Sequence, residues 1–254
     1  MDMQITFDVN PLIKRLDAIK AVQVPFATSL ALNRIAKGAK KAQQDGMRKS
    51  FNNPVPYTIN SIYIKSSNKN NLNAEVGIKE FAGKGNAARD YLFPQIAGGS
   101  AYATRFQKSL RAKGILAPGE YAVPTQSDFL RRNQYGNVTP GEYTKALFDL
   151  QAFRDSSAFA YRKNASLKRT KPQRFFARTT AQYNSRGGNF YPGIYFTNKV
   201  KSARLNKESA AFWFQSTPSF KGKYDFTGIG SRYALDNWNK EFGQALAQAI
   251  ASAK

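Results

Sequence analysis

A long stretch of this chain is basic without interruption. Between Ser156 and Lys207 there are twelve basic residues and no acidic one. Such an excess of like charge is costly through self-repulsion, unless it is spread out or neutralised by nucleic acid phosphates or by an acidic protein surface. The residues favoured for contact with DNA or an acidic partner are Arg162, Lys163, Lys168, Arg169, Lys171, Arg174 and Arg178.

Aromatic residues interleave with these basic residues, among them Phe176, Tyr191 and Tyr195. Basic and aromatic side chains together can bind phosphates and stack on bases. They are also favoured anchors in protein interfaces. A third interpretation is a solvated loop with core aromatics behind it, and the sequence leaves all three open.

The composition excludes most catalytic chemistry. The chain of 254 residues contains no Cys and no His, and its 39 Lys and Arg against 16 Asp and Glu give a net charge of +23. It therefore has no thiolate nucleophile, no zinc–sulfur cluster and no imidazole base. A Walker A loop and a dinucleotide-binding glycine motif are also missing. We expect a protein that is not an enzyme and that needs no cofactor and no metal.

One catalytic alternative remains, a glycosidase that works with two carboxyl groups. Such an enzyme needs its carboxyls roughly 5–10 Å apart. The only cluster of acids consists of Glu120, Asp128, Glu142 and Asp149. We interpret these residues as ordinary exposed acids of a helix and its surroundings.

Membrane and secretion signals are not expected. The opening residues, MDMQITFDVN, lack the basic and apolar regions of a secretory signal. No apolar stretch approaches the roughly 20 residues that span a bilayer. We therefore expect no membrane partner.

Amphipathic patterns predict helices towards both ends of the chain. One begins at Val24-Pro25 and fades near Gly46–Phe51, with an apolar side that includes several alanines. A surface helix on a sheet is the favoured interpretation, although the alanine face would also let another helix approach closely. The other runs from about Ser231 to Ser252, and its large apolar residues predict docking against a sheet. A shorter helix over Leu12–Ile19 is expected after a strand at Ile5–Val9.

Strand patterns fill the chain between these helices. Thr58–Lys65 and Asn73–Lys79 predict a β-hairpin with a polar tip, whose candidate subunit contacts are Ile62, Tyr63, Ile64 and Asn70. Later elements are expected at Thr104–Lys113 (helix), Tyr121–Pro124 (strand), from Thr139-Pro140 onwards (helix), and at Gly193–Thr197 and Ser209–Gln215 (strands). Trp213, on the last strand, is a further candidate for subunit contact.

These patterns predict an α+β fold. We expect a small, mainly antiparallel sheet flanked by N-terminal and C-terminal amphipathic helices, with long arms and a β-hairpin. A single structural domain over residues 1–254 is expected, in which 84–190 form an insertion or arm region. Long segments without regular structure are unusual in a lone compact domain. They become understandable if neighbouring subunits order them.

The order of several segments resembles a family of structural proteins of tailed bacteriophages, the minor tail and tail-completion proteins. The segments are Val24–Ala36 (VPFATSLALNRIA), Phe93–Leu116, Tyr121–Pro124 (YAVP), Gln134–Phe153, Pro192–Phe196 (PGIYF) and the terminal helix. The opening helix is similar to that of tail-completion protein Z of lambda-like phages. The resemblance spans nearly the whole chain and includes no catalytic motif.

The resemblance implies a virion component at the head–tail junction or in the upper tail, assembled in the host cytoplasm. Its partners would be copies of itself in a ring, with a hexamer favoured over a dodecamer. Neighbouring head–tail or tail-tube proteins, and genomic DNA in the channel, would be further partners. The alternative is a basic DNA-binding protein involved in genome packaging or condensation.

Overall fold

The chain folds into two compact units, one inserted into the other. The computed structural model describes residues 3–5, 23–83, 85–152, 175–180, 182–183, 189–198 and 207–252. Unit 1 comprises Met1–Gly99 and Phe220–Lys254, and unit 2 comprises Ser100–Ser219. The sequence predicts one domain with an insertion over 84–190, whereas contacts within the chain place the inserted unit at 100–219.

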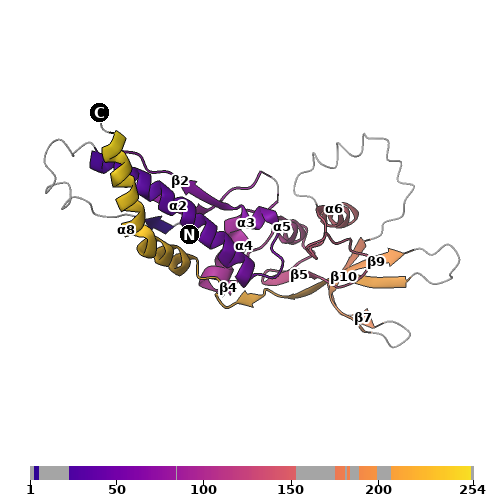
Figure 1. Cartoon of the computed structure of the whole chain (residues 1–254). Coiled ribbons are helices and arrows are strands. Elements are labelled where there is room, and N and C mark those ends of the chain that lie inside the picture. Colours follow the sequence, from indigo (N-terminus) through magenta and orange to yellow (C-terminus); the bar gives the residue numbers. More distant parts are fainter. Residues whose placement is uncertain are drawn as a thin grey trace. The chain divides into compact units, whose positions relative to one another are not determined.

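Unit 1 combines long helices with a small sheet (Figure 1). Its helices are α2 (Gln23–Ser50), α3 (Pro56–Ile59), α4 (Ala88–Ala97) and α8 (Phe226–Ser252). Strands β1 (Met3–Ile5), β2 (Ile62–Lys65) and β3 (Ala74–Ile78) form an antiparallel sheet in the order β1-β3-β2. The predicted hairpin is therefore confirmed, but its first strand begins at Ile62, because Pro56–Ile59 turn as a short helix with proline at the N-terminus.

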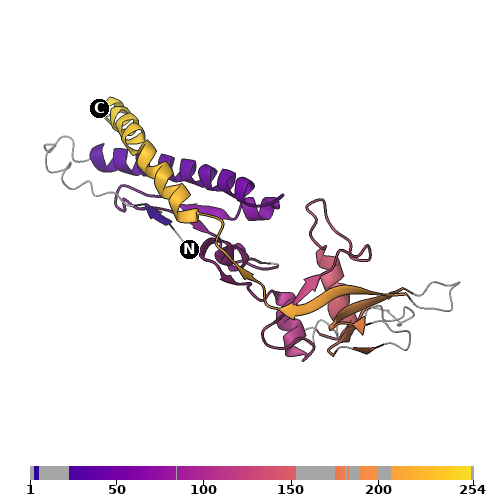
Figure 2. The same cartoon turned by 90° about the horizontal axis from the view of Figure 1, so that it is seen from below.

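Helix α2 packs against two neighbours through different sides. Its larger apolar residues, such as Leu32 and Ile35, share a buried cluster with Val76 and Ile78 of β3. Its alanines Ala27 and Ala31 meet Ala245 and Ala249 of α8 in a second cluster, where α8 crosses α2 (Figure 2). The helix thus packs on a sheet and also on another helix, as the two interpretations of its sequence suggested.

The prediction that α8 docks against a sheet is wrong in its main contact. The residues of α8 that are buried against α2 are mostly small, whereas Leu235 is 69% and Ile250 52% exposed. Trp238, Phe242 and Leu246 are only partly buried at the edge of the alanine cluster. Close helix packing needs small side chains at the crossing point, so the alanines, not the large residues, determine which side of α8 faces α2.

Two glycines of α2 lie directly beneath side chains of α8. A Cβ atom built on Gly38 would lie 2.0 Å from the hydroxyl oxygen of Tyr233, and one on Gly46 would lie 2.7 Å from the Cδ1 atom of Ile229. Contacts this short are not tolerated without movement of the neighbour. The two glycines therefore let the aromatic and aliphatic side chains of α8 rest on the backbone of α2.

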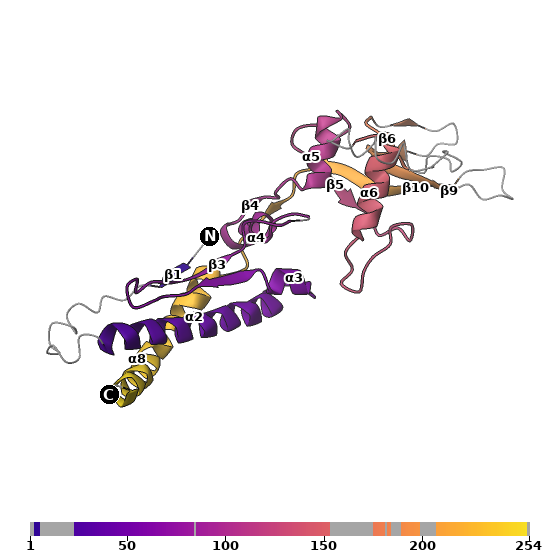
Figure 3. The same ribbon diagram turned by 90° about the horizontal axis from the view of Figure 1, so that it is seen from above.

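Unit 2 is built on a four-stranded antiparallel sheet. Its strands are β5 (Glu120–Pro124), β10 (Lys207–Ser216), β9 (Gly193–Asn198) and β6 (Phe175–Arg178), in that order. Helices α5 (Arg105–Ala112) and α6 (Pro140–Asp149) lie along one side of it (Figure 3). A separate ribbon pairs β7 (Gln182–Tyr183) with β8 (Asn189–Phe190). The apolar core lies between the helices and the sheet and includes Phe106, Leu110 and Phe212.

The chain passes between the units in two short strands, β4 (Gly99–Ser100) and β11 (Ser219–Phe220), which pair with each other. Within unit 2, the amide of Ala101 donates a hydrogen bond to the carbonyl oxygen of Pro218 at 2.7 Å. The two ends of the inserted unit therefore lie next to each other.

The α+β class predicted from the sequence is confirmed, as are the helices over 24–51 and 104–113 and the strands at 121–124, 193–197 and 209–215. The expected helix over Leu12–Ile19 and the residues 6–9 of the first strand lie outside the described residues. Among the helices that the structure describes, none has the length and apolar character needed to cross a membrane.

Candidate interaction surface

The sheet of unit 2 has two chemically different faces. Phe175, Ile194 and Phe212 point into the core beneath α5 and α6. Successive side chains of a strand point to opposite faces, so the neighbours of these residues lie on the other face. These are Phe176 and Arg178 of β6, Tyr195 of β9 and Trp213 of β10.

Aromatic rings on this second face hold one another in place. The Trp213 ring stands edge-on to the rings of Tyr195 and Tyr191, with centroids 5.9 Å and 6.0 Å away. The Phe176 ring stacks on Tyr195 at 5.8 Å. The Tyr195 hydroxyl donates to the carbonyl oxygen of Tyr191 at 2.7 Å, which ties the loop before β9 to the strand. Edge-to-face and stacked pairs of this kind add stability beyond the area that they bury.

Arg178 is held against these rings and is neutralised there. Its guanidinium lies 5.1 Å from the centroid of Tyr195 and 5.4 Å from that of Phe176. One of its nitrogens is 2.7 Å from a carboxylate oxygen of Glu208, and the two side chains are 16% and 31% exposed. Because it is stacked and paired, the Arg178 guanidinium offers little free charge to a phosphate.

Part of this cluster reaches solvent. Tyr191 is 62% and Trp213 37% exposed, whereas Tyr195 beneath them is only 2% exposed. Burial raises the pKa of Tyr195, and the charge of Arg178 acts in the opposite direction. The hydroxyl is therefore protonated near neutral pH and is the donor to Tyr191. We call Phe176, Arg178, Tyr191, Tyr195, Glu208 and Trp213 the aromatic surface.

Two of the candidate residues found in the sequence thus meet on one surface. Arg178 was assigned to DNA or an acidic partner and Trp213 to subunit contact, and both contact Tyr195. Their partner Glu208 was missed, because it lies next to Lys207 at the end of the basic stretch and belongs to no recognisable motif. For Arg178 a signal was available in the sequence. It alternates with Phe175 and Ala177 along one strand, which places its side chain on the face opposite the core. The other basic candidates, Arg162, Lys163, Lys168, Arg169, Lys171 and Arg174, lie outside the described residues.

The hairpin candidates of unit 1 have different environments. Ile62 is fully buried and belongs to the core, which corrects its assignment as a subunit contact, because it has no surface to offer. Ile64 packs partly against the same core, and Tyr63 donates a hydrogen bond to Glu75 at 2.5 Å. Asn70 is exposed in the turn, where its amide donates to Asn68 Oδ1 at 2.9 Å.

Three of the four acids weighed for glycosidase chemistry have structural roles, and the fourth, Asp128, is exposed. Glu142 is buried, contrary to the expectation of exposed acids, and pairs with Lys145 at 2.6 Å. Asp149 accepts the amide of Phe175 at 3.0 Å, and Glu120 accepts that of Ala117 at 2.9 Å. Each of these carboxylates is thus used to fix the backbone or to pair with a neighbouring lysine.

Comparisons with models of protein families, with characterised proteins and with solved structures found no match for this chain.

Proposed function

We propose that this chain is a structural subunit of a tailed-bacteriophage virion. It forms a homo-oligomeric ring, with a hexamer favoured, at the head–tail junction or in the upper tail, and it has no catalytic activity. The order of segments that resembles minor tail and tail-completion proteins motivates this proposal. The single structural observation that supports it best is the aromatic surface of unit 2.

The composition of the aromatic surface suits contact with protein. Trp, Tyr and Arg are the residues that most often dominate the binding energy of protein interfaces. Here they are already fixed by ring contacts and by the Arg178–Glu208 ion pair. A surface that is ordered before binding loses less conformational entropy on association.

The charge of the aromatic surface suits contact with another copy of the chain. With a net charge of +23, two copies repel each other wherever their basic residues come together. Within the part of the chain that the structure describes, the paired Arg178 and Glu208 add no net charge beside the exposed rings of Tyr191 and Trp213. In a ring, each aromatic surface would contact a different surface of the next subunit, and rotation would close the assembly.

The test is the mass of the purified protein by native mass spectrometry and analytical ultracentrifugation. We expect one assembly of fixed size, most simply a hexamer. Trp213→Ala should weaken it by about 2 kcal/mol or more per contact, which is about 30-fold in the dissociation constant. Phe81→Ala is the control, because Phe81 is 88% exposed and belongs to unit 1. A monomeric wild type, or a Trp213→Ala variant that assembles like the wild type, would contradict the proposal.

Location is tested separately. The protein should copurify with intact phage particles in a fixed number of copies per particle, as measured by quantitative mass spectrometry. Immunogold labelling should place it at the neck or upper tail. Its absence from purified particles would exclude the virion role, whatever its mass in solution.

The second candidate function is a basic DNA-binding protein for genome packaging or condensation. The net charge of +23 is the observation that favours it. A wild type that remains a monomer, is absent from particles and binds duplex DNA would favour this candidate over the ring subunit.

A further inference from the structure

We propose that the solvent face of α2 is a binding site for the phosphate backbone of double-stranded DNA. The site consists of Lys37, Lys40, Lys41 and Arg48, and we call it the lysine stripe. It lies in unit 1 and shares no residue with the aromatic surface or with the basic candidates found in the sequence. The inference does not depend on ring formation.

Helix geometry places these cations on one side. Lys37, Lys41 and Arg48 are separated by four and seven residues, so they lie almost in a line along the helix, with Lys40 beside them. The opposite side is fixed, because Ile35 and Ala39 are fully buried between α2 and the rest of unit 1. With 28 residues, α2 extends about 42 Å, and it cannot turn its cations away from solvent.

The lysines of the stripe have no acidic partners among the described residues. Arg34 is 4.0 Å from a carboxylate oxygen of Glu241, and Arg48 is 2.8 Å from one of Asp45. No carboxylate within the described ranges forms an ion pair with Lys37, Lys40 or Lys41. As far as the described residues go, these three ammonium groups are therefore available to replace the counterions of a DNA backbone.

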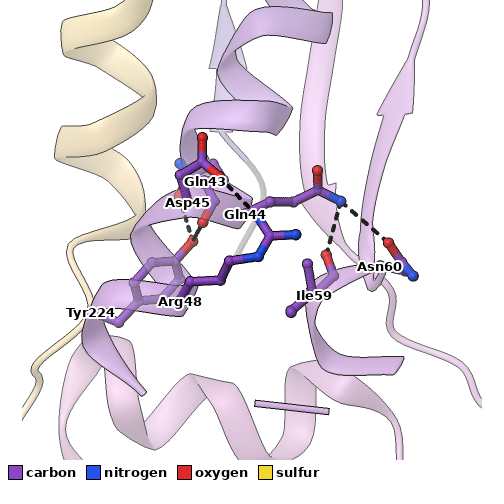
Figure 4. A network of polar contacts seen from close by, with 7 residues as sticks. All are labelled: Gln43, Gln44, Asp45, Arg48, Ile59, Asn60 and Tyr224. Carbon is purple, nitrogen blue, oxygen red and sulfur yellow. Dashed lines mark hydrogen bonds and ion pairs between the residues drawn. The ribbon is translucent and has the colours of Figure 1, made fainter. Parts of the chain in front are cut away.

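The polar residues beside the stripe are already occupied. The side chain of Asn33 exchanges two hydrogen bonds with the backbone of Ser67, at 2.8 Å and 2.9 Å. Gln44 donates to the carbonyl oxygen of Ile59 at 3.2 Å and to Asn60 Oδ1 at 3.4 Å (Figure 4). Amides like these can read bases only when they are free. These two amides therefore add no base contacts to the stripe, whose lysines we expect to contact phosphates, and its binding should be independent of sequence.

The same surface is poorly suited to an acidic protein. Between Lys37 and Lys49 the exposed residues of α2 are all charged: Lys37, Lys41, Asp45, Arg48 and Lys49. Protein interfaces usually have a desolvated centre of aromatic or apolar side chains, and lysine is depleted in them. A row of ammonium groups along a helix matches the regular charges of a duplex better than it matches a folded protein surface.

The test is binding of the full-length protein to a 30-base-pair duplex of random sequence, measured by fluorescence anisotropy at several salt concentrations. Each phosphate contact contributes about 0.9 to the slope of log affinity against log salt. The triple variant Lys37→Gln, Lys40→Gln, Lys41→Gln should therefore lower that slope by about 2.7. The variant Lys37→Arg, Lys40→Arg, Lys41→Arg, which keeps the charges, should retain the wild-type slope.

The matched control removes the same charge elsewhere in unit 1. Lys69, Lys221 and Lys240 are exposed, and changing all three to Gln should reduce the slope by less than 1. Equal losses in the control and in the stripe variant would overturn the site, because net charge alone would explain both. An unchanged slope in the stripe variant would overturn it too.

Polyglutamate is the competing probe. If the stripe variant loses more affinity for polyglutamate than for the duplex, the surface is a site for acidic protein and the proposal is wrong.

Circular dichroism is recorded on every variant to check that it is folded. Lys37 and Lys41 are exposed and Lys40 is half-buried, and the residues introduced into α2 are good helix formers. Loss of fold in the Lys→Gln variant alone would therefore show that the lysines are structural, and would also overturn the proposal.

Discussion

The buried hydroxyl of Tyr224 links α2 to the start of α8. It contacts the backbone oxygen of Gln43 at 3.1 Å and the side-chain oxygen of Gln43 at 2.6 Å (Figure 4). The side-chain nitrogen of Gln43 in turn donates to the carbonyl oxygen of Phe226. Tyr224 is 1% exposed, and burial raises its pKa above the ordinary value of 10.0. The hydroxyl therefore stays protonated over the whole physiological range and acts as a structural donor.

The raised pKa of Tyr224 predicts how stability depends on alkaline pH. Above pH 10 the tyrosine ionises in the unfolded chain but not in the folded one, so the free energy of unfolding falls by up to about 1.4 kcal/mol per pH unit. Tyr224→Phe removes this dependence. At pH 8 it should destabilise unit 1 by about 1–2 kcal/mol, because the oxygens of Gln43 lose their donor.

Urea unfolding at pH 8, 10 and 11, followed by circular dichroism, measures both effects. The difference in stability between wild type and Tyr224→Phe should shrink as the pH rises above 10. Other tyrosines with raised pKa values, such as Tyr91 and Tyr143, contribute equally to both proteins. A constant difference across this pH range would mean that Tyr224 does not resist ionisation.

Single residues also show where sequence reasoning fails. The positions of Ile62, Ile64 and Trp213 within strands could be read from alternation, but the face that is covered could not. Ile62 faces the core of unit 1, while Trp213 lies on the face opposite the core of unit 2. The face of each sheet that is covered depends on where helices α2, α5 and α6 pack. The packing of these helices is determined by contacts between parts of the chain that are distant in sequence.

At the scale of secondary structure elements, the α2–α8 contact depends on Gly38. Alanine is the better helix former by about 1 kcal/mol, but at this position its methyl group would lie 2.0 Å from the Tyr233 hydroxyl oxygen and 2.3 Å from its Cζ atom. Displacing the ring should cost more than the helix gains, so Gly38→Ala should lower the free energy of unfolding by about 1–3 kcal/mol.

Gly243 supplies the matched control for this substitution. It lies in α8 with no atom within 4 Å of a Cβ built on it. Gly243→Ala should therefore raise stability by about 0.5–1 kcal/mol. Thermal or urea unfolding of both variants gives the comparison. If both variants gain stability, the close approach of Tyr233 to α2 does not hold the helices together.

The element boundaries show what local patterns can and cannot specify. The start of α2 and the end of α5 were predictable from Pro25 and Gly114, since proline favours a first turn and glycine a helix end. The start of α8 was predicted at about Ser231, whereas the helix begins at Phe226 and includes Gly228 and Gly230. In the structure, Asp225 Oδ1 accepts the amide of Gly228 at 2.8 Å and caps the first turn. The packing of α8 on α2 was not predicted. The large apolar residues of α8 form the more obvious helical pattern, and they suggested docking on a sheet, whereas the contact is made by alanines.

For the whole molecule, the insertion of unit 2 into unit 1 predicts that unit 1 can fold without it. Both ends of the inserted unit are adjacent, as the hydrogen bond from Ala101 to Pro218 shows. Among the described residues, the cores around Leu32 and Ala31 draw only on unit 1. A shortened chain that joins Ser100 to Ser219 through Asn-Gly, the pair favoured in the tightest turns, therefore keeps every contact of these cores.

This shortened chain should unfold in one cooperative transition and retain the circular dichroism of α2 and α8. It also separates the two proposed surfaces. Without the aromatic surface it should be a monomer, while the lysine stripe should still bind duplex DNA, with a salt slope that Lys37→Gln, Lys40→Gln, Lys41→Gln lowers by about 2.7. If it assembled like the wild type, the ring contact would lie in unit 1. If it folded but its DNA binding no longer responded to the three substitutions, α2 would need residues of unit 2 to reach the duplex.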